Sequence, residues 1–274
     1  MPDKTDRNIL VSIALATYNG EAFLDKQIDS LLNQSYRNIE IVISDDKSSD
    51  DTASIIEKYQ RLDDRIFFSV NPHPQGFKKN FERAILSCRG EIIFLCDQDD
   101  VWHPNKIEEH MRIYKDNPDT NWIYNEFQIT DSEGKVINKM TDINPDYYQP
   151  LGIYRMSNGN CKLGCATSYR KNTLDKALPI NDLAPGHDSW IQLAIYPAKH
   201  HHIDKILQDY RQHGKNIFGI YSKKSFDPAK EREDNINKNI AYLKSLCLDQ
   251  RFVFGKRTFL ATILALKLLR HKII

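Results

Sequence analysis

The stretch Ile92-Ile93-Phe94-Leu95-Cys96-Asp97-Gln98-Asp99-Asp100-Val101-Trp102 decides the fold of this 274-residue chain. Its first five residues are apolar, which suits one strand in the interior of a sheet. Three carboxylates follow within four positions, and in an open α/β sheet the carboxyl ends of the strands are where ligands bind. Carboxylates at this spacing suit a hard divalent cation that also holds a phosphate. The alternative is an acidic turn in solvent, with Asp100 as the N-cap of the next helix.

Apolar strands alternate with amphipathic helices on both sides of this stretch. The pattern predicts strands over 9–16, 39–44 and 66–70, and helices over 21–34, about 50–59, 76–87 and 104–114. Elements in this order form parallel βαβ units. Polar residues follow three of the four strands, at Thr17-Tyr18-Asn19, Asp45-Asp46 and Asp97 to Asp100, so we expect them to meet in one crevice. No glycine-rich loop follows a strand, which argues against a P-loop or a dinucleotide fingerprint.

The second half of the chain has a less regular pattern. It predicts strands over 122–129, 136–137, 162–169 and 202–210, a helix from 185 through 195, and a long surface loop over 140–160. A charged helix is expected over 227–248 and an apolar one over 258–269. Successive side chains of a strand point to opposite faces, so we interpret the run from His200 to His202 as structural rather than as a metal site.

Composition limits the classes of function that remain. The length allows one core, or one core with a smaller lobe. The formal net charge of +1 gives no overall field that would attract nucleic acid. Five cysteines, an odd number, favour free thiols in a reducing compartment. The charged N-terminus does not resemble a signal peptide, and no stretch reaches the about 20 apolar residues that span a bilayer. We therefore expect a cytoplasmic protein.

Several motifs together resemble family 2 glycosyltransferases. They are Val11-Ser12-Ile13 through Tyr18-Asn19-Gly20, Leu32-Asn33-Gln34-Ser35, Ser44 through Asp50, and Asp97-Gln98-Asp99-Asp100. A bacterial subgroup that includes rhamnosyltransferases and other O-antigen or capsule sugar transferases is similar at Asp97 through Trp102, Gly186 through Trp190 and Tyr210 through Gly214. The resemblance covers residues 9 to about 216.

The resemblance implies an α/β fold of the GT-A type, with a Rossmann-like, mixed and mostly parallel sheet flanked by helices. Residues 1–216 would form the catalytic domain, with a nucleotide-sugar half over about 1–117 and an acceptor half over about 118–216. Residues 217–274 would form a C-terminal helical extension. The implied activity is inverting, metal-dependent transfer from a UDP- or dTDP-sugar to a saccharide hydroxyl in polysaccharide synthesis. The QxxRW motif of processive members is absent, which favours one sugar per encounter.

The resemblance also implies roles for individual residues. Asp188 matches the catalytic base, and Asp99 with His213 would hold a Mg²⁺ or Mn²⁺ ion. Gly164, His187 and Trp190 would contact the acceptor, although the family usually has a carboxylate where this chain has His187. The nucleotide sugar would be bound by Thr17, Tyr18, Asn19, Glu21, Asp45, Asp46, Gly76, Asn80, Asp97, Gln98, Asp100 and Arg211.

Structural roles are the alternatives for three of these residues. Asp45 could cap the helix that follows it, because acidic pairs at strand ends often do so. Asp188 could be a first-turn helix residue that the helix dipole stabilises. His213 could be a loop histidine in solvent.

The C-terminal tail of the chain is basic and apolar. Between Arg251 and Ile274 there are six Lys or Arg and no Asp or Glu. We hypothesise that 252–272 form an interfacial helix that holds the enzyme beside a lipid-linked acceptor at the inner membrane face; packing on the domain or in a dimer is the alternative.

A nucleotidyltransferase acting on sugar phosphates would usually carry a glycine-rich, basic N-terminal loop, which is absent. A non-catalytic nucleotide-sugar-binding protein would not need its acids intact.

Overall fold

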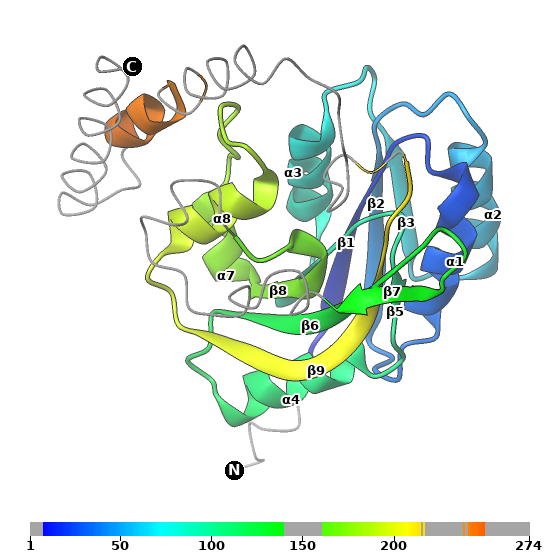
Figure 1. Cartoon of the computed structure of the whole chain (residues 1–274), viewed down its shortest axis with the longest axis horizontal. Helices are drawn as coiled ribbons and strands as arrows, with labels where there is room; N and C mark the ends of the chain where they lie inside the picture. The colour runs from blue at the N-terminus through cyan, green and yellow to red at the C-terminus, as the bar shows by residue number, and fades with distance from the viewer. Residues whose placement is uncertain (1–7, 140–160, 215, 217–237, 239–240, 250–274) are drawn as a thin grey trace.

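The computed structural model describes residues 8–139, 161–214, 216, 238 and 241–249. Its strands are β1 Val11–Thr17, β2 Ile39–Asp45, β3 Ile66–Val70, β4 Ile92–Cys96, β5 Val101–Trp102, β6 Trp122–Thr130, β7 Val136–Lys139, β8 Thr167–Arg170 and β9 His200–Arg211. They form one mixed sheet in the order β3-β2-β1-β4-β8-β6-β9-β5, and β7 pairs with β6 beside this path (Figure 1). The expected α/β class is confirmed.

Helices cover both faces of the sheet. They are α1 Glu21–Leu32, α2 Thr52–Leu62, α3 Phe77–Ser87, α4 Lys106–Asp116, α7 Lys171–Leu174 and α8 His187–Ile195, with short 3₁₀ turns η2 Gly164–Ala166 and η3 Asp175–Ala177. Side chains of α3, α7 and α8 share one core cluster, and those of α1, α2 and α4 share another (Figure 1). The two clusters lie on opposite sides of the central strands.

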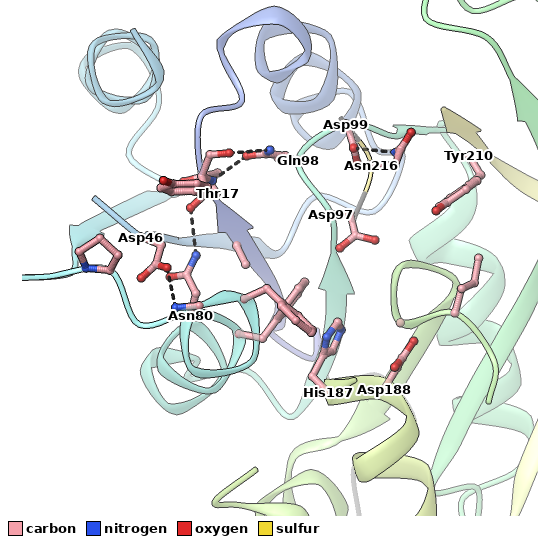
Figure 2. A pocket seen from close by; sticks show the side chains of 18 residues that line it. Thr17, Asp46, Asn80, Asp97, Gln98, Asp99, His187, Asp188, Tyr210 and Asn216 are labelled. Atoms are coloured by element: carbon pink, nitrogen blue, oxygen red, sulfur yellow. Dashed lines mark hydrogen bonds between the residues drawn. The ribbon is translucent and has the colours of Figure 1, made fainter. Parts of the chain in front are cut away.

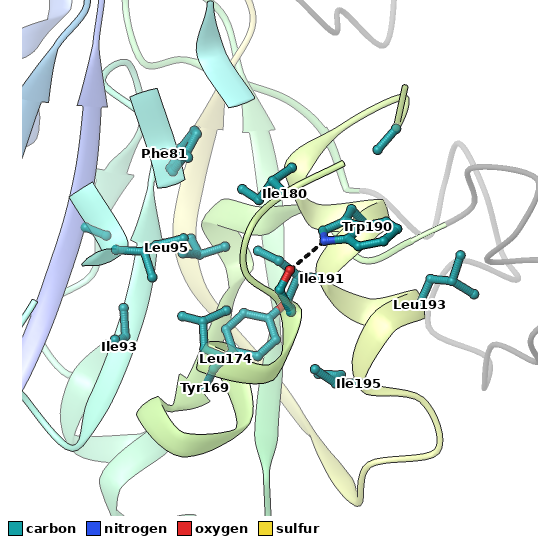
Figure 3. Close-up of a cluster of buried hydrophobic side chains, with 14 of the residues drawn as sticks. Phe81, Ile93, Leu95, Tyr169, Leu174, Ile180, Trp190, Ile191, Leu193 and Ile195 are labelled. Atoms are coloured by element: carbon teal, nitrogen blue, oxygen red, sulfur yellow. Dashed lines mark hydrogen bonds between the residues drawn. The ribbon is translucent and has the colours of Figure 1, made fainter. Parts of the chain in front are cut away.

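Strand β4 is apolar throughout because it is buried on both of its faces. Ile93 and Leu95 belong to the cluster with α3 and α8, whereas Ile92, Phe94 and Cys96 belong to the cluster with α1 and α4. All five residues have 0% exposed surface. Figure 3 shows Ile93 and Leu95 beside Phe81 and the residues of α8. A run of apolar residues, rather than an alternating pattern, is what such a strand requires.

The first four strands run parallel, as the βαβ pattern predicted. β1 pairs with both β2 and β4, and β2 pairs with β3, all in parallel. Thr17 stands opposite Asp45, and Leu15 stands opposite Cys96. The polar residues that follow β1, β2 and β4 therefore leave the sheet at the same edge. Beyond β4 the sheet is mixed, since β8 pairs with β4 antiparallel and β6 pairs with β9 parallel.

The predicted strand over 162–169 is wrong in its first half. Leu163 to Ala166 turn instead, with the Ala166 N–H donating to the Leu163 carbonyl at 3.1 Å. The Thr167 hydroxyl donates to the Gly164 carbonyl at 2.6 Å, so this turn is held from within. The strand begins only at Thr167, where pairing with β4 and β6 becomes available.

The three histidines lie in β9, which begins at His200, and serve different partners. The His201 ring is 2.8 Å from the Thr120 hydroxyl, and His202 is 3.5 Å from Glu126. In the described part of the chain, the residues grouped closely enough to share a metal ion are Asp97, Asp100 and Cys165. The histidine run does not form such a group, consistent with its structural interpretation.

The described part of the C-terminal segment is helical over 241–248 and packs onto the domain. Tyr242, Leu243 and Leu246 are buried in the cluster of α3 and α8, and the Asn181 amide donates to the Ser245 hydroxyl at 2.9 Å. The expected loop over 140–160, the apolar helix over 258–269 and the interfacial segment 252–272 lie outside the described residues. The domain boundary at 216 stays a prediction.

Among the described residues, we find no helix with the length and the apolar composition that spanning a bilayer requires.

Glu40 ties together the amino ends of the central strands, away from the polar edge. Its carboxylate accepts hydrogen bonds from the Ser12 hydroxyl at 2.5 Å, the Arg89 N–H at 2.6 Å and the Arg89 guanidinium at 2.7 Å. Burial raises the pKa of Glu40, but these hydrogen bonds outweigh it and leave the pKa below the usual 4.5. The carboxylate therefore stabilises the fold fully above pH 4.5, and this contribution is lost as the pH falls through the lowered pKa.

We expect Glu40→Gln to cost about 2 kcal/mol of unfolding free energy at pH 7, because charge-assisted hydrogen bonds to a buried group are lost. Urea denaturation at pH 7 and at pH 3.5 measures the unfolding free energy of the variant and of the parent protein. The difference between these two free energies should be smaller at pH 3.5. Glu57→Gln is the matched control, since Glu57 is a half-exposed surface residue 4.0 Å from Arg61. A pH-independent loss in Glu40→Gln would contradict the assigned role of its charge.

Candidate active site

A cavity of about 500 Å³ opens at the carboxyl ends of β1, β2 and β4. Figure 2 shows Thr17, Asp46 and Asn80 on one side, His187 and Asp188 on the other, and Asp97 above His187 and Asp188. The three polar groups expected to meet therefore share one cavity. Its lining residues are Ala16, Thr17, Tyr18, Asp46, Pro74, Gly76, Phe77, Asn80, Phe81, Asp97, Gln98, Asp99, Leu163, Gly164, His187, Asp188, Tyr210 and Asn216.

Gln98, which belongs to the acidic stretch after β4, hydrogen-bonds the backbone that follows β1. Its side-chain carbonyl accepts from the Tyr18 N–H at 2.8 Å, and its amide donates to the Tyr18 carbonyl at 3.0 Å. A Cβ on Gly20 would lie 2.4 Å from Gln98 Oε1, so a glycine is needed at this close approach. Tyr18 is 51% exposed and lines the cavity.

The two acids that end β2 have different positions. Asp45 is buried behind the cavity, where it accepts from the Thr17 hydroxyl at 2.8 Å and from Ser48 N–H at 2.8 Å. Asp46 lines the cavity and accepts from the Asn71 amide and from the Gln75 and Gly76 N–H groups, each at 2.8 Å. Asp45 thus holds a turn, and Asp46 is the member of the pair that a ligand can approach.

Asn19 and Glu21, also predicted to bind the nucleotide sugar, hold the neighbouring loop instead. The Asn19 side chain accepts from the Ser49 N–H at 2.9 Å, and Glu21 accepts from the Asp51 N–H at 3.0 Å. Neither residue lines the cavity. The N-cap of helix α2 is Asp51, and the Asp50 carboxylate just before it accepts from the Thr52 N–H at 3.1 Å.

Asp99 lies beside His213, the other residue that was predicted to hold a metal ion. The carboxylate lies 2.8 Å from His213 Nε2 and accepts from the Asn216 amide at 3.2 Å. The His213 ring stacks on Phe23 with 4.1 Å between centroids, which fixes its plane. A loop that follows β9 therefore brings an imidazole and an amide to the acid at the end of β4.

Asp97 and Asp100 lie deeper than Asp99. Burial and the charges of Asp99 and Asp188 raise the pKa of Asp97 to about 7. Asp100 has 0% exposed surface and accepts from the Arg211 N–H at 3.3 Å through one oxygen. Its other oxygen, Oδ2, has no hydrogen-bond partner among the described residues. Asp100 does not line the cavity, and one of its oxygens lies in a cluster with Asp97 and Cys165 whose ligand atoms are within 4.8 Å of one another.

This set of side chains fits a divalent cation. Asp46, Asp97, Asp99 and Asp188 line the cavity, while its described lining contains no Lys or Arg. A phosphate group would be repelled there unless a cation joined it. Carboxylate oxygens and one imidazole are ligands that Mg²⁺ and Mn²⁺ accept.

One buried lysine balances part of this negative charge from beneath. Lys106 has 0% exposed surface, donates to the Cys165 carbonyl at 2.6 Å and to the Gln208 side chain, and lies 3.8 Å from the centroid of the Trp102 ring. Burial lowers its pKa to about 8, although the nearby carboxylates act in the opposite direction. Lys106 lies in the first turn of an amphipathic helix, and this sequence pattern did not indicate that its side chain would be buried.

Asp188 stands in the first turn of α8, on the far side of the cavity from Asp46. Its Oδ1 accepts from the Ser189 N–H at 2.7 Å, and the Ser189 hydroxyl accepts from the Gly186 N–H at 3.1 Å. Burial and the Asp188 carboxylate raise the pKa of the neighbouring Cys161 thiol. The carboxylate thus has a fixed orientation at the helix start while it lines the cavity.

Two further predicted contact residues, Trp190 and Arg211, also do not line the cavity. Trp190 has 0% exposed surface and its indole N–H donates to the Ala177 carbonyl at 2.6 Å, so it is a core residue rather than an acceptor contact (Figure 3). Arg211 is 2% exposed, and its guanidinium lies 5.2 Å from the Phe23 ring. It is placed behind the acidic cluster.

The sequence patterns missed Tyr210 and Asn216, which also line the cavity. Both lie at or just after the carboxyl end of β9, so the signal was a polar residue following a strand, as for the other groups.

A family model described as Glycosyl transferase family 2 matches residues 12–178, more than half of the chain. An uncharacterized glycosyltransferase of Nostoc sp. is 28% identical over 220 residues, which cover 75% of this chain and 66% of the relative. The Escherichia coli UDP-Glc:alpha-D-GlcNAc-diphosphoundecaprenol beta-1,3-glucosyltransferase WfgD is 30% identical over 166 residues, which cover 60% of this chain and 61% of that protein. The match spans slightly less than two thirds of each relative.

Solved structures resemble the whole chain. Staphylococcus aureus TarS residues 1–349 in complex with UDP has a TM-score of 0.63 at 18% identity, covering 97% of this chain and 72% of that one. The mannosyltransferase PcManGT of Pyrobaculum calidifontis, in complex with GDP-Man and Mn²⁺, has a TM-score of 0.61 at 14% identity, covering 96% and 82%. At these identities the likeness concerns the fold.

Proposed function

Because this chain belongs to glycosyl transferase family 2, we propose that it transfers one sugar from a nucleoside diphosphate sugar to a hydroxyl of a lipid-linked saccharide. The fold is that of GT-A glycosyltransferases, and the chain is a glycosyltransferase enzyme. The observation that carries the proposal is the placement of Asp188 across one cavity from Asp46, with Asp97 and Asp99 lining the same cavity.

The donor would lie along the carboxyl ends of β1, β2 and β4. Tyr18 and Thr17 would contact the base and ribose, and Asp46 would face the base, because these groups line the same side of the cavity. Asn80 joins this side, since its amide donates to the Thr17 carbonyl at 3.0 Å. Bound UDP in TarS and bound GDP-Man in PcManGT support a nucleoside diphosphate sugar as the donor class. We propose a UDP- or dTDP-sugar.

Asp99 and His213 would hold the divalent cation, Mg²⁺ or Mn²⁺, with Asp97 beside them. When bound, such an ion offsets the charge that develops on the departing diphosphate. Mn²⁺ in the PcManGT complex supports this proposal. The absence of Lys and Arg from the described cavity lining supports it independently.

Asp188 would act as the general base. As the acceptor oxygen bonds to the anomeric carbon, the bond from that carbon to the diphosphate oxygen breaks, and the hydroxyl proton passes to Asp188. A single displacement of this kind inverts the configuration of the carbon. One carboxylate is enough for it, in agreement with a histidine at position 187 where the family usually has an acid.

The assay that tests the proposal supplies Mn²⁺, one nucleotide sugar and a saccharide-diphosphoundecaprenol acceptor. UDP-glucose, UDP-N-acetylglucosamine, dTDP-rhamnose and GDP-mannose form the donor panel. We expect release of the nucleoside diphosphate and an acceptor heavier by one sugar, by mass spectrometry. Release of pyrophosphate would instead identify a nucleotidyltransferase, and no turnover with any pair would favour a binding protein.

A lipid-linked acceptor is supported by the diphosphoundecaprenol substrate in the name of the Escherichia coli relative. The basic and apolar composition of 252–272 supports a contact with the inner membrane face. We expect the full chain to float with liposomes that contain anionic lipid, and a chain ending at Asp249 to float several-fold less. Equal flotation of the two chains would remove the membrane proposal and leave the transfer proposal standing.

A further inference from the structure

His187 is a buried histidine whose two ring nitrogens have no hydrogen-bond partner among the described residues. The residue is 7% exposed and lines the cavity next to Asp188. Figure 2 shows its ring beside the Asp188 carboxylate, below Asp97. A buried polar group without a partner costs about 1–3 kcal/mol, so a ligand that supplies the partner would recover this cost.

His110, the other buried histidine among the described residues, shows how this fold accommodates a structural histidine. His110 has 0% exposed surface, with one ring nitrogen 2.8 Å from the Ser168 hydroxyl and the other 3.1 Å from the Asn125 side-chain oxygen. Both nitrogens are thus satisfied from within the protein. The contrast indicates that the partner of His187 comes from outside it.

The His187 ring is held in one orientation. It stacks on Phe81 with 3.8 Å between centroids and meets the edge of Phe77 at 6.2 Å. A Cβ on Gly164 would lie 2.6 Å from His187 Nε2, so only a glycine leaves room for the ring in this position. A ring fixed in this way keeps both nitrogens, which are themselves buried, in the wall of the cavity beside Asp188.

The chemistry of the site selects the kind of partner. Burial lowers the pKa of His187, so at neutral pH the ring is uncharged, with one nitrogen donating and the other accepting. A sugar hydroxyl also donates and accepts, and therefore matches it. A carboxylate does not, because four aspartates and no described Lys or Arg line the cavity.

We propose that His187 is a specificity-determining residue that hydrogen-bonds a hydroxyl of a neutral saccharide in this cavity, and that sugars carrying a carboxylate are excluded. This inference rests on the proposed glycosyl transfer. The hydroxyl belongs either to the transferred sugar or to the acceptor. In the first case donor binding depends on His187, and in the second case the acceptor KM depends on it.

His187→Phe tests the proposal, because phenylalanine keeps the stacking on Phe81 and removes both nitrogens. Calorimetry with Mn²⁺ compares each nucleotide sugar of the panel with its parent nucleoside diphosphate. We expect binding of the parent diphosphate to be unchanged and binding of the matching nucleotide sugar to weaken about tenfold, the size of one well-placed hydrogen bond. If donor binding is unchanged and the acceptor KM rises about tenfold, the hydroxyl is the acceptor's. If neither changes, the proposal is overturned.

His187→Gln and the stability of the free protein complete the test. Glutamine keeps one donor and one acceptor, so it should retain most of the affinity that phenylalanine loses. The unliganded His187→Phe protein should melt at the same or a higher temperature, since two unsatisfied nitrogens are replaced by carbon. A melting temperature several degrees lower would show that the nitrogens have a structural partner and would overturn the proposal.

The proposed exclusion of sugars that carry a carboxylate is tested with UDP-glucose and UDP-glucuronic acid, which differ at one carbon. We expect the glucuronic acid donor to bind at least about tenfold more weakly to the parent protein. Equal or tighter binding would overturn this part. If the parent enzyme binds no donor of the panel and transfers none, the proposed function fails, and the inference falls with it.

Discussion

Asp188→Asn should abolish most sugar transfer while leaving the donor bound as tightly as before. The loss expected is about 100-fold or more in kcat, because the acceptor hydroxyl would keep its proton during attack. Asparagine retains an oxygen that can accept from the Ser189 N–H, the bond that Asp188 Oδ1 makes at 2.7 Å. The start of α8 should therefore stay intact, and the effect should be confined to the chemical step.

Single-turnover transfer and donor titration, measured on the same preparation, separate the two effects. Asp119→Asn is the matched control, because Asp119 is an acid with 85% of its side chain exposed, opposite Lys199 on the surface. It should change neither quantity. Near-normal turnover in Asp188→Asn would mean that another group takes the proton, and the role of base would have to be reassigned.

Asp99→Asn should lower transfer by about 100-fold or more for a different reason. The variant removes the charge that faces His213 at 2.8 Å, and with it part of the attraction for a divalent cation. A cation that stabilises a leaving diphosphate contributes several kcal/mol, which corresponds to this factor. Unlike Asp188→Asn, this variant should also weaken donor binding.

Calorimetric titration of Mn²⁺ in the presence of the nucleoside diphosphate measures the second prediction directly. We expect the apparent Mn²⁺ affinity to fall at least about tenfold, and a high Mn²⁺ concentration to restore part of the activity. Asp64→Asn, at an exposed acid between α2 and β3, is the control. If Mn²⁺ affinity is unchanged while activity is lost, Asp99 acts on the donor rather than on the ion.

Strand ends were predictable from the sequence because a strand buried on both faces has a distinct composition. The run from Ile92 to Cys96 fixed β4 and, with it, the position of the acids that follow. Parallel pairing of β1, β2 and β4 then places Thr17, Asp46 and Asp97 at one edge. These steps need only local patterns and the rule that ligands lie at carboxyl strand ends.

Orientation at single residues was less predictable. Asp45 and Asp46 are adjacent and chemically identical, and only the turn after β2 decides which of them faces the cavity. Trp190 is two residues after Asp188, about 200° around a helix, so it points into the core while Asp188 points out of it. A motif that includes both residues does not show this difference.

Long-range pairing determined the rest of the site. His213 and Asn216 reach Asp99 because β9 pairs with β6 along its length and, at Gln208 and Asp209, also with β5, which directly follows the acidic stretch. The burial of Lys106 likewise depends on Cys165 and Gln208, which are far away in sequence. Propensity and periodicity carry no information about such contacts.

The packing of residues 241–248 also bears on how the protein should be produced. Tyr242, Leu243 and Leu246 are buried in the same core as Trp190 of α8, although they lie well beyond the last strand. A recombinant version trimmed at residue 216 would leave this apolar surface open to water and would tend to self-associate. Loss of activity in such a fragment would then report aggregation, not a missing catalytic group.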